Sequence, residues 1–384
     1  MPPIRLLHVL EATVGGTRRH LLDLCLGLPR DQFRQHVVCS VLREERFLAD
    51  IEVLRAAGVE VTILPMRREI RPLADWQCLK QLREMMAQWQ PQIVHGHSSK
   101  GGFLARLAAR GLQPRPKIVY NPHGFAFQMR TSPLRHGLYV MLERRAGRMT
   151  DRLIAPCASQ QALTLQERIV PACRIAVIPN GIRPEDFVVS VDRQEYRRSL
   201  GVPADATLLG SVAALVPQKG LETLVRAVAA VRRERPAVHL AVAGQWPLQP
   251  QLERLASKLD PAGGIHFLGQ RDDVPQLLAA LDLFVLPSLW EGMPYSLLEA
   301  GAAGVPVVAT DIPGNADLIV PGETGLLARP GDALELAVTL FRALDDPARP
   351  RMAAALQERV RREFTLEAMI EGHVRLYGEL VGRI

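Results

Sequence analysis

The chain has few cysteines, few aromatic residues and no long apolar segment. Of its 384 residues, five are cysteine and 5% are Phe, Trp or Tyr. The cysteines form no CxxC pair and no regular spacing, so we expect no disulfide framework and interpret them as reduced core residues of a cytoplasmic protein. The N-terminal stretch MPPIRLLHVL lacks the apolar core of a signal peptide, and no run of about 18 apolar residues predicts a membrane span.

Acidic residues are scarce in the first half of the chain. Residues 1–180 hold 26 Lys and Arg against 14 Asp and Glu, whereas the remainder holds 21 against 26, for a net charge of +7. This imbalance predicts an anionic partner for the first half, such as a phosphorylated substrate or a membrane surface, with a solvated basic face as the alternative. No aromatic RNA-binding motif or recognition helix accompanies the charge, so we expect no nucleic-acid partner.

The pattern of apolar residues predicts an α/β protein with two Rossmann-like domains. Hydrophobic residues make up 48% of a chain that is long for a single core. Short β-branched runs alternate with helical patterns in two series, separated by the turn-rich stretch NGIRPEDF near residues 181–190. The expected strands are 4–10, 36–42, 59–65, 92–95, 117–121, 152–156 and 174–179, then 207–213, 238–244, 265–269, 283–288 and 305–310.

In open α/β sheets the ligand lies beyond the carboxyl ends of the strands, and two such sheets facing each other would enclose an interdomain cleft. Polar residues and glycines do come directly after the expected strands, which predicts a ligand site there. They are Gly15, Gly16, His95, His97, His123, Asn180, Gly181, Lys219, Gly244, Gly269, Glu291 and Asp311.

The stretch PSLWEGMPYSLLEAGAAGVPVVAT (287–310) carries the strongest signal. We expect Pro294 at the first helical position, where its missing N–H costs nothing. The next amides along the chain could then bind an anion at the helix N-terminus, with Glu291 before them and Glu299 one turn inside the helix. These amides belong to Tyr295, Ser296 and Leu297.

A second phosphate signal is SVAALVPQKG (211–220), which joins an expected strand to an expected helix. It contains one cation, Lys219, and a glycine. A cation and a glycine at a strand-to-helix turn are typical of a phosphate-binding site. An ordinary surface lysine is the alternative.

His95 and His97 form an HxH pair whose alternate positions share one face of a strand. Zinc is conceivable, but no third ligand is evident in the sequence, so we expect no metal. We interpret His97 as lining an acceptor site and His95 as structural. Lys100 contacts an acceptor phosphate in one interpretation and is merely exposed in the other.

The segment PLRHGLYVMLERRAGRM (133–149) predicts a helix with an apolar stripe beside Arg145 and Arg148. Such a helix could contact an anionic membrane peripherally, with the arginine stems in the apolar layer and the charged ends among head groups. The alternative is that the two arginines form buried salt bridges, for example to Glu143. The stripe consists of Leu134, Leu138, Met141 and Leu142.

Taken in order, these stretches resemble the retaining GT-B glycosyltransferases of family 4. The Glu291–Glu299 stretch is similar to that family's E-x7-E block, and PQKG to its phosphate lysine. GGTRRH (15–20), VHGHSSKGG (94–102), NPHGF (121–125) and IPNGI (178–182) resemble its glycine loop, acceptor-side loop, sugar-contacting loop and hinge. The resemblance covers nearly the whole chain. It implies an acceptor-binding domain of residues 1–183 with the C-terminal helix 365–384, and a donor-binding domain of residues 184–364.

The resemblance also implies roles for individual residues. Glu291, His123 and Lys219 are the expected catalytic residues: the first two contact the transferred sugar and Lys219 pairs with the donor diphosphate. Glu299 holds the ribose hydroxyls, and Gly15 and Gly16 let backbone amides approach the diphosphate. No metal or other cofactor is implied. The remaining expected donor contacts are Gly244, Arg271, Pro294, Tyr295, Ser296 and Leu297.

One position departs from the family pattern. The family usually has an arginine five residues before the phosphate lysine, and this chain has Ala214. An arginine–phosphate contact contributes roughly 1.5–3 kcal/mol, so either another cation substitutes or the site is weakened. Arg18 and Arg19 are the favoured substitutes. Arg183 and Arg271 are further candidates.

The resulting hypothesis is a retaining transfer of a sugar, by default from a UDP-sugar, to a glycan or polyprenyl-diphosphate-linked acceptor in cell-surface polysaccharide synthesis. We expect the protein in the cytoplasm, free or at the inner face of the membrane. Two alternatives stay open. A glycoside hydrolase would use Glu291 and Glu299 as a carboxylate pair. A non-catalytic nucleotide-sugar-binding protein would explain Ala214.

Overall fold

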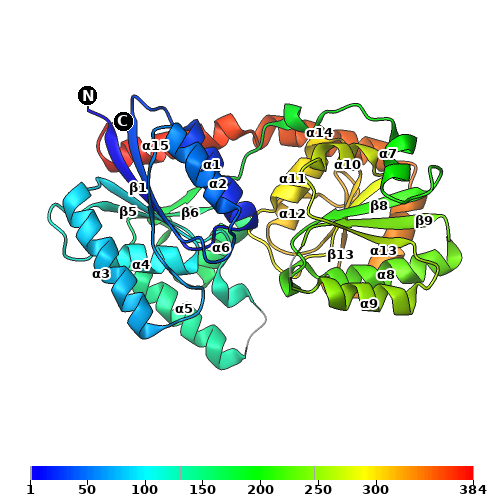
Figure 1. Ribbon diagram of the computed structural model, residues 1–384, viewed down its shortest axis with the longest axis horizontal. Helices are drawn as coiled ribbons and strands as arrows, with labels where there is room; N and C mark the ends of the chain where they lie inside the picture. Colours follow the sequence, from blue (N-terminus) through cyan, green and yellow to red (C-terminus); the bar gives the residue numbers. More distant parts are fainter. Residues whose placement is uncertain (1, 130–131, 246, 384) are drawn as a thin grey trace. The chain divides into compact units, whose positions relative to one another are not determined.

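The computed structural model describes residues 2–129, 132–245 and 247–383, and the chain forms two compact units. Unit 1 contains residues 1–180 and 366–384, and unit 2 contains residues 181–365. Each unit is a parallel β-sheet with helices on both faces (Figure 1). This arrangement confirms the predicted α/β class with two Rossmann-like sheets.

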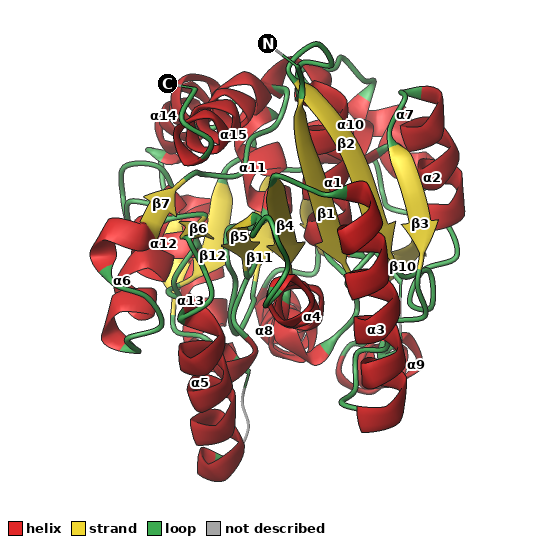
Figure 2. Cartoon of the chain, turned by 90° about the vertical axis from the view of Figure 1, so that its left-hand side faces the viewer, coloured by secondary structure: helices red, strands yellow, loops and turns green. Residues whose placement is uncertain are grey.

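Unit 1 holds a sheet in the order β3-β2-β1-β4-β5-β6-β7, shown in Figure 2 with β3 and β7 at its edges. All strand pairs described in it are parallel. The strands are β1 Ile4–Leu10, β2 Phe33–Cys39, β3 Glu60–Ile63, β4 Ile93–His97, β5 Lys117–Asn121, β6 Arg152–Ala155 and β7 Ile175–Val177.

Alternation along the strands of unit 1 builds two cores, one on each face of the sheet. Leu6 on β1 packs with the C-terminal helix α15, whereas Leu7 packs on the opposite face against α3 and α4. The helix α1 lies on the same face as α15. The helices are α1 Gly15–Gly27, α2 Phe47–Ala56, α3 Pro72–Trp89, α4 Ser99–Ala109, α5 Pro133–Gly147, α6 Ala158–Gln166 and α15 Leu366–Leu380.

Unit 2 holds a second parallel sheet in the order β10-β9-β8-β11-β12-β13. Its strands are β8 Thr207–Val212, β9 Val238–Ala243, β10 Ile265–Gly269, β11 Leu283–Leu286, β12 Val307–Thr310 and β13 Leu326–Ala328. Its helices are α7 Arg193–Ser199, α8 Leu221–Glu234, α9 Gln249–Leu259, α10 Val274–Ala280, α11 Tyr295–Ala302, α12 Asn315–Leu318, α13 Ala333–Asp345 and α14 Arg349–Glu363.

Helix α8 illustrates why the sequence folds this way. Its apolar residues recur at spacings of three and four, so they form one buried stripe against the sheet. Glu222 in the first turn and Arg232 and Arg233 in the last turn suit the helix dipole. The stripe consists of Leu221, Leu224, Val225, Val228 and Val231.

All expected strands but one lie within two residues of the observed ones, and one observed strand was not expected. The strand expected at 36–42 is β2 at Phe33–Cys39, because Gln35 is a buried strand residue whose amide donates to the Cys25 carbonyl. Strand β13 was not expected, since its three residues Leu326–Ala328 are too few to show a periodicity.

In each sheet two central strands mark a change of direction: the earlier part of the chain adds strands toward one edge of the sheet, and the later part adds them toward the other. These strands are β1 and β4 in unit 1, and β8 and β11 in unit 2. A crevice opens beyond the carboxyl ends of strands at such a point, because the loops after them turn to opposite faces. The segments after β8 and β11 are those that contain Lys219 and Glu291.

Candidate active site

Lys219 and Glu291 lie far apart in the sequence but meet in unit 2, in the segments that follow β8 and β11. The Lys219 ammonium lies 2.5 Å from Glu291 Oε1, and the Glu291 side chain is buried. The Ser288 hydroxyl donates to the same oxygen at 2.7 Å, and the Gln218 amide lies 3.4 Å from the other. The carboxylate is thus held in one orientation by a cation and two neutral donors.

Ser288 and Gln218 were missed in the sequence. Ser288 comes shortly after β11, and Gln218 lies in the short turn Pro217–Lys219 that precedes α8. The Gln218 amide also donates to the Trp290 carbonyl at 2.9 Å and so joins the two loops. The sequence offered one signal for both, because each is a polar residue near a predicted catalytic residue: Gln218 is next to Lys219, and Ser288 comes shortly before Glu291.

Two glycines set how closely the loops of unit 2 approach one another. Gly220 has a φ of +60°, and a Cβ there would lie 2.2 Å from the Pro287 carbonyl oxygen. Gly244 has a φ of +144°, and its Cβ would lie 1.9 Å from the Ala213 carbonyl oxygen. Only glycine accommodates both the left-handed backbone and the contact, so these residues bring the loops after β8, β9 and β11 together.

Helix α11 differs from expectation at its start. Pro294 is not the first helical residue but precedes it, with extended backbone at φ −77° and ψ 124°. The Leu297 amide donates to the Pro294 carbonyl at 3.2 Å, so the prediction that this amide awaits an anion is wrong for the described chain. Ser296 and Glu299 are half-buried on the helix, and Tyr295 is buried.

Three of the four candidate cations already hold carboxylates. Arg18 forms two hydrogen bonds to Asp50, one of them 3.0 Å long, and Arg19 pairs with Asp23 at 2.7 Å. Arg271 pairs with Asp273 through two nitrogens at 2.8 and 2.5 Å, and this hydrogen bonding raises the pKa of Arg271. Arg183 is exposed and has no ion pair with another described residue.

The segment around Ala214 is a tight turn. The Val216 amide donates to the Ala214 carbonyl at 2.8 Å, and the Leu215 amide to the Gln245 carbonyl at 3.0 Å. Ala214 is half-buried in this turn.

In unit 1 the predicted glycine loop comes after β1. Gly15 and Gly16 are exposed and begin α1, with Gly15 at a φ of +53°. Val14 precedes them in extended conformation and provides no side-chain cap. The first amides of α1 therefore lack a side-chain acceptor from the capping position, as a helix N-terminus that binds an anion requires.

His123 lies in the loop after β5 and is half-buried. Its φ is +54°, a left-handed conformation held by the hydrogen bond from its own amide to Asn121 Oδ1 at 3.0 Å. Desolvation, with a smaller effect from His373, lowers the pKa of His123 to about 3. The imidazole is therefore neutral at physiological pH, which suits a hydrogen-bond partner of a sugar hydroxyl better than a proton donor.

The structure contradicts the interpretation of His97 as lining an acceptor site, and it adds a potential third ligand that was not evident in the sequence. His97 does not line a surface: it is fully buried, with ring nitrogens 3.1 Å from His8 Nδ1 and from His123 Nε2. A third potential metal ligand does accompany His95 and His97, because His8 on the neighbouring strand lies beside them. His95 is buried and faces the Tyr377 hydroxyl at 2.7 Å, in line with the structural role expected of it.

Lys100 is neither free nor fully exposed. Its ammonium lies 2.6 Å from an Asp75 carboxylate oxygen, and its side chain is 11% exposed. A contact with an acceptor phosphate would have to compete with this ion pair.

Helix α5 exposes three of the four residues of the predicted stripe: Leu134 is 84% exposed and Leu138 and Met141 also lie at the surface, whereas Leu142 is half-buried. Arg145 and Arg148 are exposed, so the alternative of buried salt bridges is wrong. Glu143 is instead bound by Arg106 at 3.1 Å and by the Tyr120 hydroxyl at 2.9 Å.

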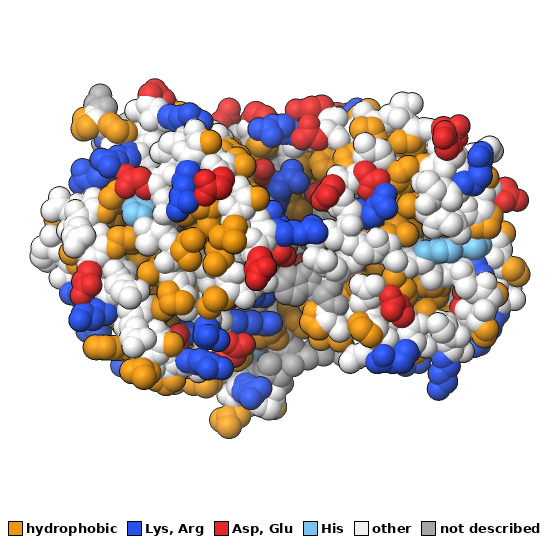
Figure 3. Space-filling model, viewed as in Figure 1, with side chains coloured by type: hydrophobic (Ala, Val, Ile, Leu, Met, Phe, Trp, Pro, Cys, Tyr) orange, Lys and Arg blue, Asp and Glu red, His pale blue; other side chains and the backbone are white. Residues whose placement is uncertain are grey.

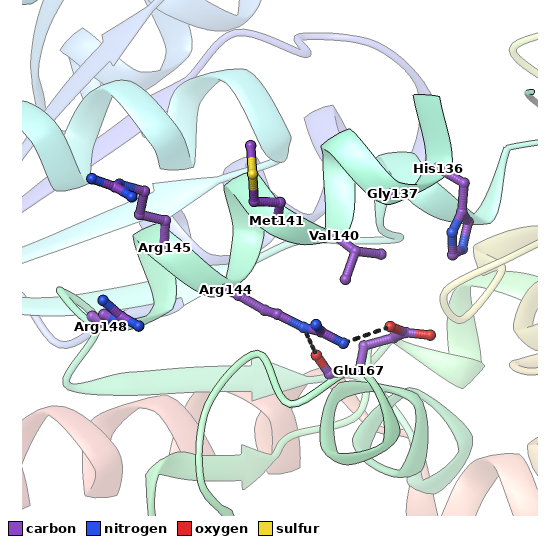
Figure 4. A pocket seen from close by; sticks show the side chains of 8 residues that line it. All are labelled: His136, Gly137, Val140, Met141, Arg144, Arg145, Arg148 and Glu167. Carbon is purple, nitrogen blue, oxygen red and sulfur yellow. Dashed lines mark hydrogen bonds and ion pairs between the residues drawn. The ribbon is translucent and has the colours of Figure 1, made fainter. Parts of the chain in front are cut away.

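A cavity of about 450 Å³ lies along this helix (Figure 4). Figure 4 shows Arg144 reaching Glu167, whose side-chain oxygen it meets at 3.4 Å, while Arg145 extends from the same helix and Arg148 from the position that follows it. Figure 3 shows blue basic and orange apolar side chains together along the lower edge of unit 1, where Figure 1 places α5. None of the described helices has both the length and the apolar character needed to cross a membrane.

Comparisons with known proteins place nearly the whole chain in one family. Residues 14–186 match the family described as Glycosyltransferase Family 4, and residues 192–363 match Glycosyl transferases group 1. A UDP-Gal:alpha-D-GlcNAc-diphosphoundecaprenol alpha-1,3-galactosyltransferase of Escherichia coli is 30% identical over 98% of this chain and 97% of its own. The lipopolysaccharide core biosynthesis glycosyltransferase LpsE of Rhizobium meliloti is 35% identical over 49% of this chain and 54% of its own.

Among solved structures, that of HepE from Anabaena in complex with UDP-glucose superposes with a TM-score of 0.81. It is 23% identical and covers 98% of this chain and 99% of that one. At this identity the likeness concerns the fold alone.

Proposed function

Because the chain belongs to the glycosyltransferases of family 4, also described as glycosyl transferases group 1, we propose that it transfers a sugar from a UDP-sugar to a polyprenyl-diphosphate-linked glycan with retention of configuration. The observation that carries the proposal is the Lys219–Glu291 pair at the strand reversal of unit 2. The donor and acceptor of the Escherichia coli relative support this choice of substrates.

In this proposal the donor binds mainly to unit 2. Lys219 leaves Glu291 when the diphosphate arrives and stabilises the charge that develops as the nucleotide departs. Glu291 then contacts the transferred sugar, kept in place by Ser288. Glu299 holds the ribose hydroxyls. His123, neutral because its ring is desolvated, accepts or donates one hydrogen bond to the sugar.

The proton of the attacking hydroxyl goes to the departing phosphate. The new glycosidic bond forms on the face that the phosphate leaves, which retains the anomeric configuration. No activated serine or cysteine nucleophile is needed for this course.

The test is nucleotide release from UDP-galactose, UDP-glucose and GDP-mannose, with and without polyprenyl-diphosphate-linked N-acetylglucosamine. We expect release from a UDP-sugar that depends on the acceptor, and a product whose anomeric configuration by NMR equals that of the donor. Saturable nucleotide binding without turnover on any acceptor would favour the non-catalytic alternative. An inverted product would contradict the retaining course, and cleavage of a nucleotide-free glycoside would favour a hydrolase.

Replacing Ala214 by arginine is expected to tighten UDP binding about 10- to 100-fold, because one arginine–phosphate contact contributes roughly 1.5–3 kcal/mol. The position is half-buried and follows β8, as Lys219 does. Calorimetry with UDP measures the effect. Ala214→Met adds length without charge and should leave the affinity within about twofold. An unchanged affinity in Ala214→Arg would show that the diphosphate does not lie beside this turn.

We further propose that the exposed face of α5 binds the anionic membrane that carries the acceptor. The apolar side chains of Leu134, Leu138 and Met141 are exposed next to Arg145 and Arg148. Apolar residues with adjacent basic ones are what a peripheral membrane helix presents to lipid head groups.

The Arg145→Gln/Arg148→Gln double variant should bind vesicles of phosphatidylglycerol and phosphatidylcholine about 10- to 30-fold more weakly at low salt, because each basic residue contributes about 1 kcal/mol near an anionic surface. Co-sedimentation measures the binding. The double variant Arg351→Gln/Arg361→Gln removes the same charge from exposed positions on α14 and should bind as the unaltered chain does. If both double variants lost vesicle binding equally, the binding would depend on net charge alone and not on α5.

A further inference from the structure

Six histidines gather in unit 1 at one end of the sheet. They come from strands β1 and β4, from α1, from the loop after β5 and from α15. Their rings stack or tilt against one another with centroids 3.9 to 6.0 Å apart. The proposed transfer reaction uses only one of them. They are His8, His20, His95, His97, His123 and His373.

Three of these histidines project from the same face of two neighbouring strands. His95 and His97 occupy alternate positions of β4, and His8 on β1 is the parallel partner of His95. One side-chain nitrogen from each ring lies within 4.8 Å of one from each of the other two. Rigid strands rather than a loop therefore determine the positions of these nitrogens.

The spacing suits coordination by a small cation. His8 Nδ1 and His97 Nε2 are 3.1 Å apart. A zinc–nitrogen bond of about 2.0–2.1 Å places two tetrahedral ligand nitrogens about 3.3 Å apart. The His8 and His97 nitrogens therefore need to move apart by only a few tenths of an ångström, and the His95 nitrogen lies within 4.8 Å of both.

The chemical state of the rings also suits a metal. All three are fully buried, and desolvation lowers the pKa of His8 to about 3 and those of His95 and His97 well below the usual value. They are thus neutral, which is the ligand form of imidazole. His95 Nε2 is buried with no hydrogen-bond partner among the described residues. The other ring nitrogen of His95 forms a hydrogen bond with the Tyr377 hydroxyl. In metal sites the second nitrogen of a ligand imidazole commonly forms such a bond, which orients the ring.

We propose that His8, His95 and His97 bind one divalent cation of the zinc class, with the fourth position left for water. An all-imidazole set favours Zn²⁺, Co²⁺ or Ni²⁺ over Mg²⁺ and Ca²⁺, which prefer oxygen ligands. The ion ties β1 to β4, and His97 also meets His123. A second triad, His20–His97–His123, shares His97 but takes one ligand from a loop and includes a half-buried ring. The three strand residues are therefore the better site.

The experiment uses the full chain freed of metal by a chelator and dialysis. Calorimetric titration with Zn²⁺ should show one ion per chain with a Kd at or below about 1 µM. Co²⁺ should produce the strong visible absorption of a four-coordinate site. A 100-fold excess of Zn²⁺ over Kd should raise the melting midpoint of unit 1 by about 5–10 °C. No binding at one equivalent to the folded chain overturns the proposal.

Variants then locate the ion. His95→Gln should weaken Zn²⁺ binding at least 100-fold, whereas His123→Gln removes only a hydrogen-bond partner of His97 and should weaken it about 10-fold or less. The pair His239–His266 in unit 2 is the matched control, because its ring nitrogens lie 3.0 Å apart and no third ligand accompanies them among the described residues. His266→Gln should therefore bind as the unaltered chain does. Loss of binding in His266→Gln, or a loss in His123→Gln as large as that in His95→Gln, overturns the assignment.

If His95→Gln does not fold, X-ray absorption at the zinc edge of the unaltered chain replaces it. Three imidazoles and one oxygen in the coordination shell support the site. A shell of oxygens, or one with a single imidazole, overturns it. Neither measurement depends on transferase activity, so a failure of the proposed function leaves this result intact.

Discussion

Replacing Lys219 by methionine is expected to lower kcat/KM about 10²- to 10³-fold. The ammonium lies at the carboxyl end of the central strands of unit 2, already in contact with the Glu291 carboxylate. The donor diphosphate gains charge as it leaves, and a preorganised charge at that point contributes about 2.7–4 kcal/mol to transition-state stabilisation. In the proposal Lys219 contributes more of this stabilisation, because Ala214 stands where the family pattern has a second cation. Steady-state kinetics with saturating acceptor measures the loss.

The controls separate charge from folding. Lys219→Arg keeps a cation at the site and should retain most of the activity that Lys219→Met loses. Lys219 is 19% exposed, and its loss leaves Glu291 with the Ser288 hydroxyl and Gln218 amide as partners. We therefore expect the free energy of unfolding to fall by only about 1–3 kcal/mol. If Lys219→Met keeps more than a third of the activity, the lysine does not contact the diphosphate.

Replacing Glu291 by glutamine is expected to lower kcat about 10²- to 10³-fold while KM for the donor changes little. The amide has the shape of the carboxylate and keeps an oxygen to accept from Ser288. It lacks the negative charge that faces both Lys219 and, in the proposal, the positive charge that develops on the sugar ring. Single-turnover and steady-state kinetics together distinguish a loss in the chemical step from a loss in binding.

Glu299→Gln provides the comparison for Glu291→Gln. Glu299 is half-buried on α11 and in the proposal holds the ribose hydroxyls equally in ground and transition states. Its replacement should raise KM about 10- to 100-fold with kcat nearly unchanged. If Glu291→Gln instead raised KM and spared kcat, Glu291 would be a binding residue and the two assignments would be exchanged. A Lys219→Met/Glu291→Gln double variant should lose less than the sum of the two single losses, because the residues act as one unit.

Several residues of the candidate site were predictable because their signals are local. Lys219 and Glu291 each come shortly after a short apolar strand, and the loops that leave the carboxyl ends of parallel strands lie at one edge of the sheet. The sequence predicted the start of α11 to within one residue, but it placed Pro294 inside the helix, whereas Pro294 is the residue before it. Whether a proline is the first helical residue or precedes it depends on backbone angles that residue preferences only bias.

The ion pairs of the cations were not predictable. Arg18 with Asp50, Lys100 with Asp75 and Arg271 with Asp273 join side chains whose meeting depends on rotamers and on packing. The compensation expected from Arg18 or Arg19 must compete with carboxylates already bound to them. A sequence shows which residues are charged but not which charges are already paired.

The sequence by itself determined the two parallel sheets and the family, and it predicted a candidate site at the carboxyl ends of the strands. These depend on periodicity and on motifs in which each residue acts with its near neighbours. Only the tertiary structure decided that Lys219 forms an ion pair with Glu291 and that α5 exposes Leu134, Leu138 and Met141. The same holds for the cluster of six histidines whose rings contact one another inside unit 1. These facts arise from contacts between residues distant in the chain, and strand order and helix packing, rather than local preference, determine which of those residues meet.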